Sequence, residues 1–437
     1  MLEADRVLYS WGPGESRLAL LARDRLVELA VIRPDLVAGA VFVGRVVETA
    51  ASLDAAFVDI GLERPGFLPG GAGLGQGRSV LVQVRADAQG GKGCILTTEI
   101  SLGGRWLAYV PSRPGIVASR RLAPEEADRL AALLARLADA DEGVMIRTAA
   151  AGRQDGELDA ELRQLRQDWA EIEERRHPAK APALVWRPDP LVRVLADNPA
   201  VAQVVIDDAA TFAAARRRFP SLVAPHQGGP LFADLEDALA AALAPGVPLA
   251  DGGRLVIDTV AALTAIDVDS GSGRPADANR QAIDAIAREL RLRNIGGQIV
   301  VDFVSGGGKG NLFKLVGSLK RAVAADPTPT HVFGVTALGL VELTRERRGP
   351  SLAEVMCERQ TCVSAPAAAL AALRLAVAEA AHRPGKALAL AVAPEVAAAL
   401  ARLPAAVAEA EQRIGRKLAV RPDPARARED AVIEEQG

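Results

Sequence analysis

One stretch of this chain, residues 255–309, constrains its fold more than any other. Two runs rich in β-branched residues, 262–268 and 298–304, bracket a segment whose apolar residues recur at close to the 3.6-residue period of a helix. Those apolar residues are Ile283, Ile286, Leu290 and Leu292. The pattern predicts a strand, a helix and a second strand.

Acidic residues stand at the end of each predicted strand. Asp267 and Asp269 are two residues apart and therefore project from one face, and Asp302 lies near the end of the second strand. If the strands are neighbours in one sheet, three carboxylates converge at one edge. Such a group, without cysteine or histidine, suits Mg²⁺ and phosphoryl chemistry. The alternative is that these aspartates cap turns and helix starts, and spacing alone favours it by roughly two to one.

Three segments carry a family resemblance: LTAIDVDSG, AIARELRLRNIGGQIVVDF and FGVTALGLVELTRERRGPSL. They resemble the catalytic core of the ribonuclease E/G family of bacterial endoribonucleases, and the resemblance extends along nearly the whole chain. It implies that Asp267 and Asp302 hold a catalytic Mg²⁺. Asp269 stands where the family usually has Asn and is a third candidate ligand, and the usual IDFIDM continues here as VDFVSGGGKG. The implied activity is hydrolysis of single-stranded RNA to 5′-phosphate and 3′-hydroxyl ends, in RNA processing or decay, including rRNA processing.

Composition limits the class of protein. The chain has 437 residues, 49% of them hydrophobic and 24% charged, which predicts a globular protein of two to four domains. The net charge of −3 is not that of a strongly basic nucleic-acid binder, so any RNA contact must come from local patches. Three cysteines form no disulfide framework, and neither a signal sequence nor a membrane-length apolar run is evident. We expect a soluble cytoplasmic protein without a membrane partner.

Short strands punctuated by glycine between residues 35 and 111 predict a five-stranded barrel of the OB type. Phe57 and Phe67 are candidates for base stacking, and Lys92 and Arg85 for phosphate contact. The alternative for each phenylalanine is a place in the core. The stretch AAFVDIGLERPGFLP is similar to the RNA-binding barrel of the family, which implies that Phe57, Phe67 and Lys92 contact RNA.

Arg147 and Thr148 end a predicted strand and precede the small residues 149–152. A cation and a hydroxyl beside a glycine-containing turn can hold a terminal phosphate, because backbone N–H groups add donors. The alternative is a solvated strand end. The stretch EGVMIRTAAAG resembles the GLIVRTAG strand of the family, which implies that Arg147 and Thr148 sense a 5′-monophosphate.

Two further motifs have open readings. SGGGKGN fails the G-x-x-x-x-G-K-[ST] spacing of a phosphate loop, so we rank an ATP site below an RNA phosphate contact. Lys309, Arg345 and Arg347 are candidates for contact with the scissile phosphate, with a solvated loop as the alternative.

Cys357 and Cys362 match the position of the family's zinc-linking pair, and zinc would require thiolates from a second chain. Free thiols are at least as favoured. The Ala-rich end resembles the family's small C-terminal domain, which serves oligomerisation, so we expect a homo-oligomer, a dimer rather than a zinc-linked tetramer.

The fold class that the resemblance implies is α/β and multidomain. An RNase H-like subdomain is interrupted by the OB-fold barrel and a 5′-sensor subdomain, and a DNase I-like α/β catalytic domain and a small α/β C-terminal domain follow. The expected ranges are 1–34 and 186–243 (RNase H-like), 35–112 (barrel), 113–185 (sensor), 244–350 (catalytic), 351–365 (degenerate zinc-link-like segment) and 366–437 (C-terminal). Two rivals remain: an RNA-binding relative impaired in catalysis, and an oligomeric scaffold centred on the Ala-rich end.

Overall fold

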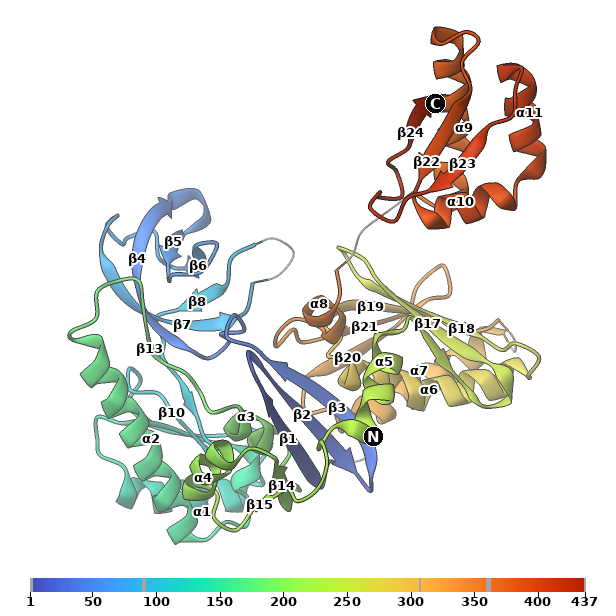
Figure 1. The fold of residues 1–437 in the computed structure, drawn as a ribbon. Helices are drawn as coiled ribbons and strands as arrows, with labels where there is room; N and C mark the ends of the chain where they lie inside the picture. The colour runs from blue at the N-terminus through green and yellow to red at the C-terminus, as the bar shows by residue number, and fades with distance from the viewer. Residues whose placement is uncertain (1–2, 89–91, 306–307, 359–362, 436–437) are drawn as a thin grey trace. The chain divides into compact units, whose positions relative to one another are not determined.

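The computed structural model describes residues 3–88, 92–305, 308–358 and 363–435, with the backbone alone described for residue 234 and for 308–311. The chain divides into two compact units, residues 1–357 and 358–437 (Figure 1). The architecture is mixed α/β, with several separate sheets. Among the described residues, no helix is both long and apolar enough to span a bilayer.

The opening strands of the chain form a sheet with strands from around residue 200. Strand β1 pairs antiparallel with β2 and parallel with β14, so the first residues and a segment almost 200 positions later share one sheet. In spatial order its strands are β15 (Val223–Pro225), β14 (Gln203–Ile206), β1 (Arg6–Gly12), β2 (Glu15–Ala22) and β3 (Arg25–Ile32). The helices beside it are α3 (Pro190–Asp197), α4 (Ala209–Arg218) and α5 (Glu236–Leu243).

Five strands after β3 form the predicted closed barrel. Pairing of β4 with β7 closes the sheet on itself, and Ala56, Val58 and Leu68 point into its buried core. The barrel strands in spatial order are β4 (Val41–Ala50), β5 (Ala55–Asp59), β6 (Gly66–Pro69), β8 (Ile95–Thr97) and β7 (Ser79–Ala86). Strand β13 (Ala183–Trp186) returns much later in the chain and pairs with β4.

A third sheet with two helices follows the barrel. Helix α2 (Asp155–Arg176) starts with a capping box between Gln154 and Glu157, and the apolar stripe read from its sequence is buried at Leu158, Leu162 and Leu165. The other elements are β9 (Leu102–Gly103), β10 (Leu107–Tyr109), β11 (Gly115–Ala118), β12 (Gly143–Ile146) and α1 (Pro124–Leu137).

The six-stranded sheet after residue 245 contains the predicted strand, helix and strand. Strands β18 and β19 are parallel neighbours, and α6 connects them. Helices α6 and α7 cover one face, where Ile286 and Leu319 pack on Ile266 and Val301. The strands in spatial order are β16 (Gly246–Pro248), β17 (Arg254–Thr259), β18 (Thr264–Asp269), β19 (Gly297–Asp302), β21 (Val341–Arg345) and β20 (Thr330–Val335). The helices are α6 (Pro275–Leu292), α7 (Gly308–Val323) and the short α8 (Leu352–Met356).

The second unit is a small α/β fold whose core is built largely from alanine. All five residues of β22 are buried, and Ala369, Ala372 and Ala376 of α9 pack in the same core. Small side chains let helix and strand approach closely, so the Ala-rich sequence is compatible with a packed unit. Its elements are α9 (Ala365–His382), β22 (Leu388–Val392), α10 (Pro394–Ala401), α11 (Pro404–Ile414), β23 (Ala419–Pro422) and β24 (Val432–Glu435).

Candidate metal-dependent active site and RNA-contacting residues

Two of the predicted metal ligands lie side by side. Asp267 and Asp302 are direct partners in the parallel pairing of β18 with β19, so their side chains leave the same face of the sheet on strands about 4.8 Å apart. Both are exposed, on the face opposite to α6 and α7. No hydrogen bond or ion pair connects either carboxylate to another described residue. Like charges at this spacing repel, and a divalent cation between them would remove the repulsion.

Asp269, the third predicted ligand, has other partners. Its carboxylate accepts a hydrogen bond from the Gly271 N–H at 2.8 Å and forms an ion pair with Arg254 at 3.3 Å. Within the described ranges, no group of three or more His, Cys, Asp or Glu side chains is arranged to hold a metal. Two carboxylates still suit Mg²⁺, because this ion commonly keeps several positions for water and phosphate oxygens.

The chain directly after Asp302 is held by a residue that no sequence pattern had indicated. Asn279 of α6 is 1% exposed; its amide donates to the Val304 carbonyl at 2.9 Å and accepts from the Val304 N–H at 3.0 Å. This reciprocal pair fastens the end of β19 to the helix that follows β18. Strand register and the Asn279 amide together therefore fix the position of Asp302.

The prediction that Arg345 contacts the scissile phosphate is wrong. Its side chain is buried, with Nε 2.8 Å from Asp326 Oδ2 and Nη1 donating to the Ile295 carbonyl at 3.0 Å. Arg345 pairs with Gly297, the first residue of β19, so it lies at the opposite end of the strand from Asp302. The Lys309 side chain, named with it, lies outside the described residues.

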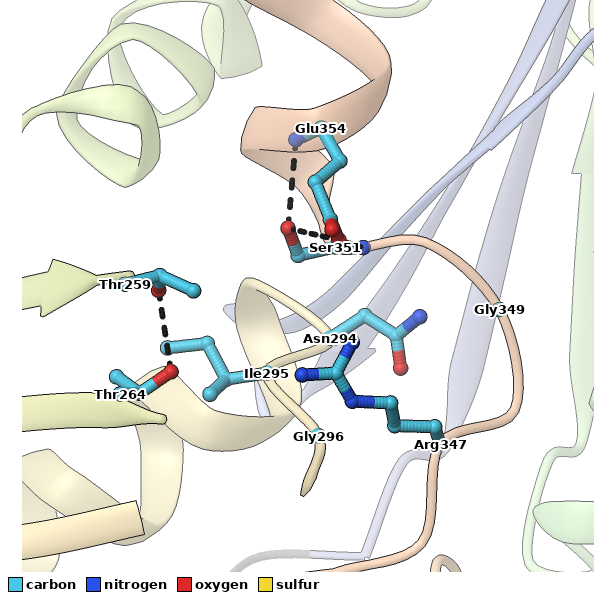
Figure 2. Close-up of a pocket in the computed structure, with 9 residues that line it drawn as sticks. All are labelled: Thr259, Thr264, Asn294, Ile295, Gly296, Arg347, Gly349, Ser351 and Glu354. Carbon is cyan, nitrogen blue, oxygen red and sulfur yellow. Dashed lines mark hydrogen bonds between the residues drawn. The ribbon is translucent and has the colours of Figure 1, made fainter. Parts of the chain in front are cut away.

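Arg347 also lies at the end of the sheet remote from the carboxylates. It packs against Gly296 and Gly297 and lines a small pocket with Thr259 and Thr264 (Figure 2). The cavity of about 10 Å³ is at the lower limit for one water molecule. Thr264 precedes Asp267 by three strand residues, roughly 10 Å. This pocket is therefore neither large enough for a nucleotide nor adjacent to the carboxylates.

The two candidate stacking residues of the barrel lie outside its core. Phe57 and Phe67 are cross-strand partners, partly exposed, with ring centroids 5.8 Å apart in an edge-to-face arrangement. Ile95 is the neighbour of Phe67 on β8 and is 41% exposed, and Lys92, also exposed, precedes it by three residues. An outward-facing apolar patch with an adjacent cation is the kind of surface that binds single-stranded nucleic acid.

Arg147 and Thr148 lie at one edge of the third sheet. Strands β11 and β12 are parallel, so Ser119 and Thr148 follow their ends together, with the two hydroxyl oxygens 2.9 Å apart. Thr148 is exposed, as are Arg120 and Arg121. The backbone N–H of Arg147 donates to the Trp106 carbonyl at 2.8 Å. Two hydroxyls thus lie together at this edge, whereas the Arg147 guanidinium reaches toward Gly103 of β9, with Nη2 3.7 Å from the position of an added Cβ there.

Charged side chains near this edge have partners of their own. Glu126 accepts from the Arg129 side chain and from the Gly152 N–H, both at 2.8 Å, and these bonds lower the pKa of Glu126 to about 2. Arg105 and Arg153 both lie 5.6 Å from the centre of the Trp106 ring. Burial, and then the charge of Arg153, lowers the pKa of the Arg105 guanidinium.

Hydrogen bonds to the Glu142 carboxylate hold the third sheet to α2. Glu142 accepts from Arg166 at 2.6 and 2.7 Å, and this pairing is the main reason that the pKa of Glu142 is lowered. Tyr109 donates its hydroxyl to the same carboxylate at 3.1 Å, and burial, reinforced by Glu142, raises the pKa of Tyr109 to about 12. These groups are structural and leave Arg147 and Thr148 available at the edge.

Comparison of the chain with known proteins identifies its relatives. The ribonuclease E/G family matches residues 101–348, a range that contains Arg147, Thr148 and both carboxylates. The chain is 32% identical to ribonuclease G of Escherichia coli (strain K12), over 80% of this chain and 81% of that protein. It is 30% identical to ribonuclease G of Haemophilus influenzae, covering 83% of each chain, and 33% identical to ribonuclease E of Nostoc sp., covering 77% of this chain and 55% of that one. With more than half of its length matched by the family, and its carboxylate pair inside the match, this chain belongs to the ribonuclease E/G family.

Proposed function

We propose that this protein is a Mg²⁺-dependent endoribonuclease that hydrolyses single-stranded RNA. The observation that carries the proposal is the pairing of Asp267 with Asp302, two exposed like charges in register on neighbouring strands. The names of the relatives support an RNA substrate and a hydrolase. The expected products carry 5′-phosphate and 3′-hydroxyl ends.

Asp267 and Asp302 would hold the metal, with Asp269 close enough along β18 to assist through water. When bound, Mg²⁺ would supply a polarised water for in-line attack and neutralise charge that develops on the scissile phosphate. The chain itself contributes the exposed position of the two carboxylates, which leaves room for a phosphodiester, and the Asn279 clamp that keeps Asp302 in place.

The remaining candidate residues would select and hold the RNA strand. Phe57 and Phe67 would stack on bases while Lys92 contacts phosphate, and Arg147 with Thr148 would bind a 5′-terminal monophosphate. Such contacts raise the affinity for single-stranded RNA without requiring a positive net charge on the whole chain.

We further assign an RNase H-like character to the sheet that contains β1 and β14, and a DNase I-like character to the six-stranded sheet that carries the carboxylates. A homodimer in the cytoplasm is the assembly and location that we propose. Cys357 is an exposed free thiol. Cys362 lies outside the described residues, and we propose no zinc link.

The test is cleavage of a short, 5′-monophosphorylated, A/U-rich single-stranded RNA by the wild type and by Asp302→Ala. We expect cleavage by the wild type only with Mg²⁺, and a loss of about 10³-fold or more in the variant, because one carboxylate alone holds the ion poorly. Asp284→Asn is the matched control: it removes an exposed acid from α6, which covers the opposite face of the sheet, and it should cleave like the wild type.

A folded wild type that binds this RNA with salt-sensitive affinity and does not cleave it at any Mg²⁺ concentration would contradict the proposal. That result would instead identify an RNA-binding relative impaired in catalysis.

A further inference from the structure

One partly buried carboxylate, on α2, is bound by three consecutive backbone N–H groups. Glu161 of α2 accepts from the N–H of Arg105 at 2.6 Å, of Trp106 at 2.8 Å and of Leu107 at 2.8 Å. Hydrogen bonds to an ionised acceptor are about twice as strong as neutral ones. Three of them on one side chain fix the path of the turn between β9 and β10.

The fit of this carboxylate against the turn is close. A Cβ atom on Gly104 would lie 2.6 Å from Glu161 Cδ, so only glycine leaves room for the carboxylate there. Burial raises the pKa of Glu161, and the three backbone N–H groups oppose that rise. The carboxylate oxygens of Glu161 thus lie against the backbone of residues 105–107.

The front of the same turn carries Arg147. The Trp106 carbonyl accepts the Arg147 N–H at 2.8 Å, and Leu107 pairs with Ile146, the residue before Arg147. The guanidinium of Arg147 lies over the start of the turn, with Nη2 3.7 Å from the Cβ position that Gly103 leaves open. One short turn therefore contacts both the Glu161 carboxylate, through its N–H groups, and the Arg147 side chain.

We infer that Glu161 is a positioning residue for recognition of a 5′-terminal phosphate on RNA. It acts through the turn 103–107, which sets the place of the Arg147 backbone and guanidinium. The inference rests on the proposed function of Arg147 and Thr148. It also implies that the N–H groups of residues 105–107 serve Glu161 rather than the phosphate.

The experiment compares single-turnover cleavage of one RNA sequence that carries either a 5′-monophosphate or a 5′-hydroxyl. For Glu161→Gln we expect the preference for the monophosphate to fall about tenfold, because a displacement of about 1 Å is enough to weaken a positioned contact. Cleavage of the 5′-hydroxyl RNA should stay within about twofold of the wild type, since the carboxylate pair is untouched. Glu174→Gln, an exposed acid on the same helix, is the control and should change neither rate.

Adding Arg147→Ala identifies the route of the effect. If Glu161 acts through Arg147, the double variant loses no more of the 5′ preference than Arg147→Ala alone. Gly104→Ala, which displaces the carboxylate without removing it, should reproduce the loss of preference and guards against a folding defect specific to Glu161→Gln.

Two results would overturn the inference alone: an unchanged 5′ preference in a folded Glu161→Gln variant, or equal losses on both RNAs together with a lower Tm. A wild type that cleaves both RNAs equally would refute the proposed 5′ sensor and the inference with it. A wild type that cleaves neither RNA would refute the proposed nuclease, and the inference would fall with it.

Discussion

The two ends of the six-stranded sheet differ in whether their charged side chains are buried and paired. Where β18 and β19 finish, Asp267 and Asp302 lie next to each other without a cationic partner among the described residues. Where β19 begins, Arg345 and Asp326 form an ion pair whose side chains are 3% and 0% exposed. A buried and paired charge serves the fold, whereas two exposed like charges cost stability until something binds them.

The end of the sheet that contains the Arg345–Asp326 ion pair also contains the sequence run RLRNIGG, which belongs to one of the segments that resemble the family. Arg291 donates to Glu28 of β3 and to Asn198, and Arg293 donates to Glu289 and to the Ala244 carbonyl. These bonds join α6 to the first sheet and to the end of α5. The RLRNIGG run is therefore structural, and the proposed metal site lies at the other end of the same strands.

The largest effect on stability is expected from breaking the pair at the structural end. Arg345→Met leaves Asp326 buried without its partner and should lower the free energy of unfolding by about 3–5 kcal/mol, measured by urea denaturation. The double variant Arg345→Met, Asp326→Leu removes both charges and should recover much of that loss. If Arg345→Met were as stable as the wild type and impaired only in cleavage, Arg345 would belong with the catalytic residues after all.

A smaller effect should follow a backbone change at the same end. Gly297 has φ of +94°, and an added Cβ would lie 2.6 Å from Arg347 Nε, so Gly297→Ala should cost about 1–2 kcal/mol. Gly334→Ala in β20 of the same sheet has free space for a Cβ and no positive φ, so it serves as the control. Equal Tm values for the two variants would contradict the importance that we give to this close approach.

The smallest effect, on cleavage, is expected at Asp269, whose carboxylate is neither buried nor without a partner. Asn at this position keeps an oxygen for the Gly271 N–H and loses only an exposed ion pair, whose contribution is typically below about 1 kcal/mol. Asp269→Asn should therefore cleave RNA within about threefold of the wild type. A loss as large as that of Asp302→Ala would show instead that the Asp269 carboxylate is an essential metal ligand.

The sequence predicted the parts of the sheet whose signals are local. The helical repeat of apolar residues predicted α6, and the two runs of β-branched residues predicted β18 and β19. The two-residue separation of Asp267 and Asp269 predicted that they share one face of β18. Arg345 was misjudged because it stood in the charged run LTRERR. It follows Val341 and Leu343 at every second position, which puts it on the buried face of β21. That alternation was the signal available and not used.

Glu161 could not be found from sequence in the same way. It stands in a charged helix beside many similar acids, and its partners are backbone N–H groups 54 to 56 positions earlier, which no residue pattern identifies. The same holds for Asn279, whose partner is the backbone of Val304. Contacts between a side chain and a distant backbone depend on the folded path of the chain, so only the structure reveals them.

The most direct test of the central claim measures thermal unfolding of the wild type and of the double variant Asp267→Asn, Asp302→Asn, with and without Mg²⁺ at constant ionic strength. Without the ion, the double variant should be at least as stable as the wild type, because it lacks the repulsion between the carboxylates. Saturating Mg²⁺ should then stabilise the wild type alone, by about 2.7 kcal/mol at a concentration 100 times Kd. Equal stabilisation of both proteins by Mg²⁺, or none in the wild type, would contradict a metal site at this carboxylate pair.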